Sequence, residues 1–390
     1  MKDMEDKRLS GIPELDEWAR EAYAQSECEL GYPGNQDIQL GDFFEWYSAN
    51  GLDRVCLNNA GDPFSSAASR MSSHRFEREV LEYFAPFYGF APNSFWGLVS
   101  SCGTDGNNHG IYFGASYLRG RTGREPVFYV SEEAHYSNMR LAHLQNLEVR
   151  LVACDAMGRM QPEALAECLT PERPCLIVYA MGSTFKGAID DQAALNAVLA
   201  RHPRMEVYRH VDAALFGGYL AFSQYADIVS QQKQGFQSIA VSGHKFFGTG
   251  NPAGLFLTTR DIYDAQDHFR IAYVNQDMKM INCSRSAFNP LKFYWLIKHI
   301  GTEAWQAQAY TLLQNTAYLC RRLEELAYPY WVNELSNTVF FKRPSDKVVE
   351  KYHLACGYDE RFGGALSHIV VMQHATREAI DTFLDDLHCM

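Results

Sequence analysis

The most reactive side chain that the sequence sets in a defined context is a lysine directly after an apolar run. Lys245 ends the segment Ser242-Gly243-His244-Lys245, which follows the apolar residues Ile239–Val241. If that run is a buried strand, the lysine lies at its carboxyl end, where open parallel sheets bind their ligands. Its amine could then react with a bound group, although a lysine in a loop is by itself more simply a solvated residue.

An aspartate occupies the same kind of position one segment earlier. Asp212 follows the apolar run Val207–Val211 and precedes Ala213-Ala214. A carboxylate in such company is unfavourable unless a cation or a hydrogen-bond donor faces it, and the alternative is a helix N-cap. The interval between Asp212 and Lys245 accommodates one crossover and the next strand. Pyridoxal phosphate (PLP) chemistry requires this pair, because a lysine forms the imine and a carboxylate keeps the pyridine nitrogen protonated.

A glycine-containing turn follows the apolar segment Phe95–Val99. Its sequence is Ser101-Cys102-Gly103-Thr104-Asp105-Gly106-Asn107. Free backbone N–H groups at a helix start, together with hydroxyl groups, suit a phosphate. The turn has neither the G-x-G-x-x-G nor the Walker spacing, which disfavours nucleotide binding.

A histidine follows the apolar run Val127–Val130. His135 lies in Glu133-Ala134-His135-Tyr136-Ser137, and an imidazole at this point could stack on an aromatic cofactor. The chain has 13 histidines, so the position of one of them means little alone. His135 gains weight because it falls between the glycine-containing turn and the Asp212–Lys245 pair.

Seven short apolar segments recur in this part of the chain, and helical patterns separate most of them. Because they show no polar alternation, they are typical of strands buried on both faces of a mostly parallel sheet. The predicted strands are Phe95–Val99, Val127–Val130, Val149–Val152, Leu176–Ala180, Val207–Val211, Ser238–Val241 and Gly254–Leu257. The predicted helices between them are Asp105–Leu118, Ser137–Gln145, Pro162–Cys168 and Gln192–Ala200.

The pattern changes after Arg285. Long helices are predicted over Leu291–Ile300 and Glu303–Leu326, then strands near Thr338–Phe341 and Ser367–Met372, and a last helix over Arg377–Leu387. We therefore predict an α/β protein in three parts. These are an N-terminal arm over residues 1–50, a large domain over 51–290 and a small C-terminal α+β domain over 291–390.

Composition narrows the classes of protein. Hydrophobic residues make up 47% of the chain and charged residues 21%, as in a globular protein. The 35 basic and 47 acidic residues give a net charge of −12, which disfavours nucleic acid and anionic membranes as partners. The ten cysteines contain no C-x-x-C pair, so we predict reduced thiols and no metal. No signal segment or membrane span is apparent, and we predict a cytoplasmic protein.

Taken in order, the motifs resemble the fold-type I PLP enzymes of the group II amino-acid decarboxylase family. They are similar in particular to bacterial PLP-dependent histidine decarboxylases and plant serine decarboxylases. The resemblance covers roughly residues 30–300 and implies the aspartate aminotransferase-like fold, with a mostly parallel central sheet. It rests on Gly31–Asn35, Leu57–Pro63, His74–Val80, Gly103–Asn107, Glu133–Ser137, Ser183–Ala188, Asp212–Ala214 and Ser242–Phe246.

The resemblance implies a role for each matching position. Lys245 would hold PLP as the internal aldimine and Asp212 would pair with the pyridinium nitrogen, between His135 stacked on one ring face and Ala214 on the other. Gly103, Thr104, Ser242 and His244 would hold the phosphate, with Thr184 near the oxygen side of the ring. The substrate-binding candidates are Asn35, Asn58, Asn59, Ser284 and Arg285. Lys245 and Tyr273, the latter donated by a second subunit, are the two candidates that protonate the α-carbon.

The implied activity is decarboxylation of a small or polar L-amino acid to the amine and CO₂, through an external aldimine and a quinonoid. Histidine is the first candidate substrate and serine the second. The segment Cys283–Ala287 departs from the Gly-Ser-Arg-Asn-Gly of relatives, which leaves the substrate open. The alternatives are another PLP reaction on this scaffold, such as an aldol-type or oxidative decarboxylating one, and an inactive PLP-binding homologue. A homodimer or homotetramer is also implied.

Overall fold

The computed structural model describes residues 10–65, 69–271 and 276–389. Its centre is a seven-stranded sheet in which β8 runs antiparallel to its two neighbours and the remaining strands are parallel to one another. The strands, in spatial order, are β2 (Phe95–Ser100), β8 (Gly254–Thr259), β7 (Ser238–Ser242), β6 (Val207–Asp212), β5 (Cys175–Ala180), β3 (Val127–Ser131) and β4 (Glu148–Val152). All seven predicted strands are present, and the predicted α/β class with its mostly parallel sheet is confirmed. The prediction that each strand is buried on both faces is wrong for β4, which lies at the edge of the sheet and leaves Leu151 52% exposed.

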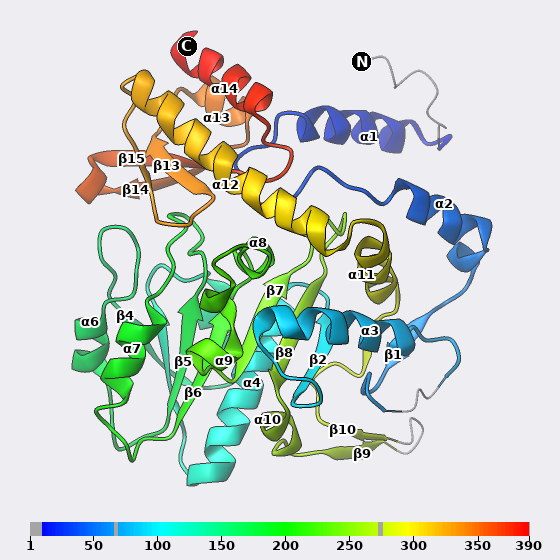
Figure 1. Ribbon diagram of the computed structural model, residues 1–390, viewed down its shortest axis with the longest axis vertical. Helices are drawn as coiled ribbons and strands as arrows, with labels where there is room; N and C mark the ends of the chain where they lie inside the picture. Colours follow the sequence, from blue (N-terminus) through cyan, green and yellow to red (C-terminus); the bar gives the residue numbers. More distant parts are fainter. Residues whose placement is uncertain (1–9, 66–68, 272–275, 390) are drawn as a thin grey trace.

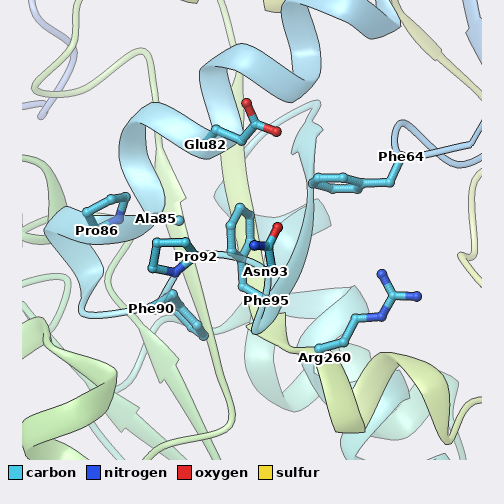
Figure 2. A pocket seen from close by; sticks show the side chains of 9 residues that line it. All are labelled: Phe64, Glu82, Ala85, Pro86, Phe90, Pro92, Asn93, Phe95 and Arg260. Carbon is cyan, nitrogen blue, oxygen red and sulfur yellow. The ribbon is translucent and has the colours of Figure 1, made fainter.

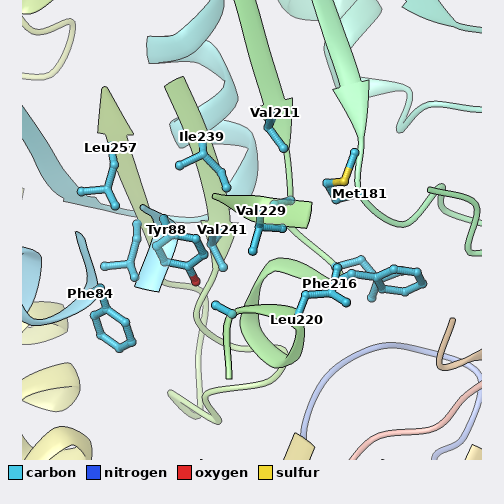
Figure 3. Packing of buried hydrophobic residues seen from close by; sticks show 14 of the residues in the cluster. Phe84, Tyr88, Met181, Val211, Phe216, Leu220, Val229, Ile239, Val241 and Leu257 are labelled. Atoms are coloured by element: carbon cyan, nitrogen blue, oxygen red, sulfur yellow. The ribbon is translucent and has the colours of Figure 1, made fainter. Parts of the chain in front are cut away.

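Helices cover both faces of this sheet (Figure 1). Neighbouring strand residues alternate between two apolar clusters, as Val127 and Phe128 do on β3. Figure 3 shows part of the larger cluster, where Val211, Ile239 and Val241 face Phe216 and Leu220. The larger cluster takes in α3 (His74–Phe84), α6 (Pro162–Cys168), α7 (Gln192–Leu199), α8 (Gly217–Ala221) and α11 (Phe288–His299). The smaller one takes in α4 (Gly103–Thr122), α5 (Ser137–Leu144) and α10 (Arg260–Asp264).

Helix α4 packs unusually close to the sheet because three glycines, spaced by four residues, face it. A Cβ atom on Gly106 would lie 2.8 Å from the Cβ of Ala240. One on Gly110 would lie 2.3 Å from the His210 ring, and one on Gly114 would lie 2.5 Å from the Tyr208 ring. Side chains separated by four residues share one helix face. The glycines therefore set the distance between α4 and strands β6 and β7, and with it the position of the first turn of α4.

The C-terminal part has a sheet of its own. It is antiparallel, in the order β12-β13-β15-β14, as the predicted α+β arrangement requires. Its elements are β12 (Tyr330–Val332), β13 (Thr338–Lys342), α13 (Asp346–Lys351), β14 (Ala355–Asp359), β15 (Gly364–Val370) and α14 (Arg377–Cys389). The long helix α12 (Gly301–Glu325) links this sheet to the large one (Figure 1): Trp305 and Leu312 pack in the large core, and Leu319 and Leu323 pack in the small core.

The N-terminal region consists of two helices joined by an extended segment, α1 (Pro13–Ser26) and α2 (Gly41–Ala49). The segment runs along the small domain, where the N–H groups of Leu30 and Gly31 both donate to the Tyr352 carbonyl at 3.2 Å. It then reaches the loop after β7, where the Asn35 N–H donates to the His244 carbonyl at 3.2 Å. The predicted arm thus bridges the small domain and the Lys245 loop. The predicted boundaries at residues 50 and 290 stay predictions.

Short elements complete the described chain. The remaining strands form two antiparallel pairs, β1 with β11 and β9 with β10. These elements are η1 (Leu52–Arg54), β1 (Asn58–Ala60), η2 (Ala85–Tyr88), η3 (Ala226–Val229), α9 (Gln231–Gln234), β9 (Phe269–Ile271), β10 (Gln276–Met278), β11 (Ser284–Ser286) and η4 (Glu360–Phe362). Over the described ranges, no helix is both long and apolar enough to cross a bilayer.

Candidate active site

A cavity of about 540 Å³ opens at the carboxyl ends of the central strands, beside the start of α4. Every residue predicted to bind the cofactor lines it: Gly103, Thr104, His135, Thr184, Asp212, Ala214, Ser242, His244 and Lys245. These residues follow five different strands or begin a helix, so only the assembled sheet brings them together. The predicted cofactor-binding residues therefore lie together in one cavity, and their individual roles stay predictions.

Lys245 and Asp212 lie in the same cavity, immediately after β7 and at the end of β6. Burial lowers the pKa of Lys245, and the nearby Asp212 carboxylate partly opposes that effect. The Asp212 side chain is held from two sides. Its Oδ2 accepts a hydrogen bond from Asn138 Nδ2 at 2.8 Å, and its Oδ1 accepts one from the Ala214 N–H at 3.2 Å. Both donors are neutral, so they orient the carboxylate without cancelling its charge.

The His135 ring is held by its own turn. Its Nδ1 lies 2.7 Å from Ser137 Oγ and accepts a hydrogen bond from the Ser137 N–H at 3.3 Å. An N–H group can only donate, so Nδ1 is an acceptor and the proton of the neutral ring lies on Nε2. Burial lowers the pKa of His135 further below neutrality. The ring is therefore an uncharged, fixed aromatic surface beside Asp212 and Lys245.

The first turn of α4 forms a tight cradle against the end of β7. A Cβ atom on Gly103 would lie 2.6 Å from Ser242 Oγ and 2.9 Å from the Ala214 Cβ, so glycine alone fits there. The first N–H groups of a helix have no partner within it, and they attract anions. The Ser242 hydroxyl and the His244 ring lie in the same cavity. Amides, hydroxyls and an imidazole around a cradle too small for a side chain are the donor set that fits a phosphate group.

The sequence reasoning missed several residues of the cavity. Asn107 lines it, and its Oδ1 accepts a hydrogen bond from His210 Nε2 at 2.9 Å; its position inside the glycine-containing turn was a usable signal. The small domain contributes Ala355, His368 and Val370, and the N-terminal segment contributes Gly31, Tyr32 and Pro33. The three N-terminal residues lie within the Gly31–Asn35 motif, whose position was a usable signal. No local pattern marks the small-domain residues, because they reach the cavity only through packing between domains.

His368 joins three of the walls. Its Nδ1 lies 2.8 Å from the Phe185 carbonyl, in the loop of Thr184, and its Nε2 lies 3.0 Å from the Gly31 carbonyl. A second interdomain contact lies nearby. The buried Lys186 ammonium donates to Glu133 Oε1 at 2.6 Å and to Asp359 Oδ2 at 2.8 Å. The small domain is therefore fastened to the loops that carry Thr184 and His135.

The predicted substrate-binding residues are not among those that line the cavity in the described structure. Arg285 forms a buried ion pair with Glu77, at 2.8 Å between Nη1 and Oε1, and Asn59 Nδ2 donates to Glu77 Oε2 at 2.8 Å. Asn58 bonds to Ser284 across the β1–β11 pair at 3.1 Å. Asn35 supports the loop after Lys245 by donating to the Phe246 carbonyl at 3.3 Å.

These contacts give Asn35, Asn59 and Arg285 structural roles in the described chain, and their roles toward the substrate stay predictions. Tyr273 lies outside the described residues.

A second cavity of about 410 Å³ lies at the opposite end of β2 (Figure 2). Phe64, Phe90 and Phe95 form its apolar side, and Glu82 and Arg260 stand at its rim. It shares no lining residue with the larger cavity. Of these two cavities, only the one of about 540 Å³ is lined by the residues predicted to bind the cofactor.

Comparisons of the sequence and of the structure with known proteins all find decarboxylases. Residues 118–340 match the pyridoxal-dependent decarboxylase conserved domain. Serine decarboxylase 1 of Oryza sativa subsp. japonica is 31% identical over 374 residues, which cover 95% of this chain and 74% of that protein. Histidine decarboxylase of Vibrio campbellii is 30% identical over 368 residues, covering 92% and 89%. The structure of L-methionine decarboxylase from Streptomyces sp. 590 superposes with a TM-score of 0.80 at 22% identity, over 96% and 94% of the two chains.

The chain therefore belongs to the pyridoxal-dependent decarboxylase family. It is a PLP-dependent amino-acid decarboxylase, a carboxy-lyase, and its cofactor is pyridoxal 5'-phosphate. The predicted family, enzyme class and cofactor are confirmed.

Proposed function

We propose that this enzyme converts a small or polar L-amino acid to its amine and CO₂, with histidine as the first candidate substrate and serine as the second. The relatives named histidine and serine decarboxylase support this choice, since they match nearly the whole chain. The single observation that carries the chemistry is the cavity that gathers Lys245, Asp212 and His135.

In this proposal the cavity residues hold PLP from three sides. Lys245 forms the covalent link to its aldehyde, and the lowered pKa of that amine keeps more of it in the reactive neutral form. The first turn of α4, with Ser242 and His244, would bind the phosphate. His135 and Ala214 would cover the two faces of the ring, and Thr184 would lie near its oxygen side. Bound PLP supplies the electron sink that accepts the electron pair left when CO₂ departs.

Asp212 controls the protonation of that sink. Its carboxylate, fixed by Asn138 and the Ala214 N–H, would hold a proton on the ring nitrogen of bound PLP and stabilise the positive charge there. Because Asn138 itself is fully buried, water does not compete for this arrangement. The Asp212–Asn138 contact thus holds the carboxylate in one orientation.

The walls of the cavity decide which bond breaks. The bond that is cleaved must stand perpendicular to the cofactor ring, so the protein selects decarboxylation by where it holds the substrate carboxylate. Apolar residues such as Leu215, Pro33 and Val370 line the cavity and limit water around that group. In this proposal Lys245 would return a proton to the α-carbon, and Tyr273 is the alternative donor.

The test is an incubation of the PLP-loaded enzyme with each of the twenty standard amino acids, followed by mass analysis of the products and CO₂ detection. We expect histamine from histidine, or ethanolamine from serine if histidine is inert. CO₂ with a ketone or aldehyde instead of an amine would point to an oxidative reaction. No product from any amino acid would refute the proposed substrate class.

We also propose that the enzyme acts as a homodimer or homotetramer in the cytoplasm. Helix α1 buries none of its residues in one subunit, and Leu15, Trp18 and Tyr23 on it are exposed. Such an apolar helix face is typical of a contact with another chain. The described cysteines are all free, as a reducing compartment favours. Light scattering of the purified enzyme is expected to give at least twice the mass of one chain, and a monomer would contradict the proposal.

A further inference from the structure

A buried lysine outside the cavity has no acidic partner among the described residues. Lys292 on α11 is 0% exposed. Its Nζ donates to the Thr249 carbonyl at 2.9 Å and to Asn251 Oδ1, and it lies 5.2 Å from the Phe288 ring centroid. No carboxylate among the described residues forms an ion pair with it. Neutral acceptors satisfy its hydrogen bonds but leave its charge uncompensated, and a buried charge of this kind normally has a counter-ion.

The structure places this lysine behind the turn that carries Ser242 and His244. Thr249, which accepts from Lys292, donates its N–H to the Gly243 carbonyl at 3.3 Å. A Cβ atom on Gly243 would lie 2.5 Å from the ring of Phe293, the neighbour of Lys292 on α11, and 3.1 Å from Thr249 Cγ2. Helix α11 and the 249–253 loop therefore pack directly on Gly243, between the two side chains assigned to the phosphate.

The pKa shifts of Lys292 and His244 agree with a position of Lys292 close to the Ser242–His244 turn. Burial lowers the pKa of Lys292 to about 8, so the amine is still mainly protonated at pH 7. Burial also lowers the pKa of His244, and the charges of Lys245 and Lys292 lower it further. The charge on Lys292 thus reaches the phosphate side of the cavity through a region from which water is excluded, where charge interactions are strong.

We propose that Lys292 is a positioning residue whose buried positive charge strengthens the binding of the PLP phosphate from behind the Ser242–His244 turn. The inference rests on the proposed phosphate site. The phosphate dianion would supply the counter-charge that no carboxylate in the described ranges provides for Lys292. The lysine itself does not touch the cofactor, and it acts through the field at the turn and through the 249–253 loop.

The test compares the dissociation constants of PLP and pyridoxal, which lacks the phosphate, for the cofactor-free full-length protein at pH 7. Lys292→Met removes the charge, Lys292→Gln keeps a hydrogen-bond donor without the charge, and Lys292→Arg keeps the charge. We expect Met and Gln to weaken PLP binding by about tenfold or more, with pyridoxal binding changed by less than about twofold. Lys292→Arg is expected to retain most of the affinity. The matched control is Lys298→Met, because Lys298 is an exposed lysine on the same helix.

A further variant leaves the lysine in place. Asn251→Asp puts a carboxylate against the Lys292 ammonium, and we expect it to weaken PLP binding in the same selective way. This variant keeps the test decisive if Lys292→Met fails to fold. Equal losses for PLP and pyridoxal would show that Lys292 only braces the loop, and unchanged PLP affinity would also overturn the inference. Wild-type protein that binds PLP no better than pyridoxal would instead refute the proposed phosphate site.

Discussion

Replacing Lys245 by alanine is expected to abolish turnover and the visible absorbance of the lysine-bound cofactor. The variant loses both the amine that attaches PLP and the group best placed to return a proton to the product, so kcat should fall by about 10⁴-fold or more. Borohydride reduction followed by peptide mapping measures the link directly. In the wild type the reduced cofactor, now a permanent label, should lie on the peptide that contains Lys245. In Lys245→Ala no peptide should carry this label.

Lys233→Ala is the control for this experiment, because Lys233 is exposed and lies outside the cavity. It should keep both the absorbance and the labelled Lys245 peptide. A Lys245→Ala protein that retains the band, or a label on another lysine in the wild type, would show that position 245 does not hold the cofactor.

The second large effect is expected at the buried acid. Asp212→Asn preserves the shape of the side chain but removes the charge that keeps the ring nitrogen protonated. Loss of such an oriented electrostatic contact lowers kcat by between about 10² and 10³-fold. The variant should still bind PLP, since Lys245 and the phosphate turn are unchanged. The measurement is kcat per mole of bound cofactor, with cofactor content determined after its release.

Asp190→Asn provides the comparison. Asp190 is also a buried aspartate, but it accepts from the Ala180 and Met160 N–H groups and lies outside the cavity. Its replacement should alter stability and leave kcat per bound cofactor within about twofold. If Asp212→Asn turned over at the wild-type rate, the electron-sink role of Asp212 would be wrong.

The central sheet, and the residues predicted to bind the cofactor, could be located from the sequence alone. Short apolar runs between helical patterns predict strands, so all seven strands were predictable from local pattern, although β4 at the sheet edge is not buried on both faces. Lys245, Asp212, His135 and Gly103 each directly follow such a run or open the helix after it. Because parallel strands end at one edge of a sheet, residues at those ends had to meet.

The remaining features depend on how distant segments pack against one another. Arg285 was predicted to bind the substrate, and nothing near it in the sequence indicates that its ion-pair partner is the buried Glu77. His368 and Val370 reach the cavity from the small domain, and Lys292 on α11 contacts Thr249, which packs against Gly243. Local sequence pattern indicates which face of an element is buried. Contacts between charged groups that are hundreds of residues apart depend on how whole elements pack. No single segment of the sequence predicts those contacts.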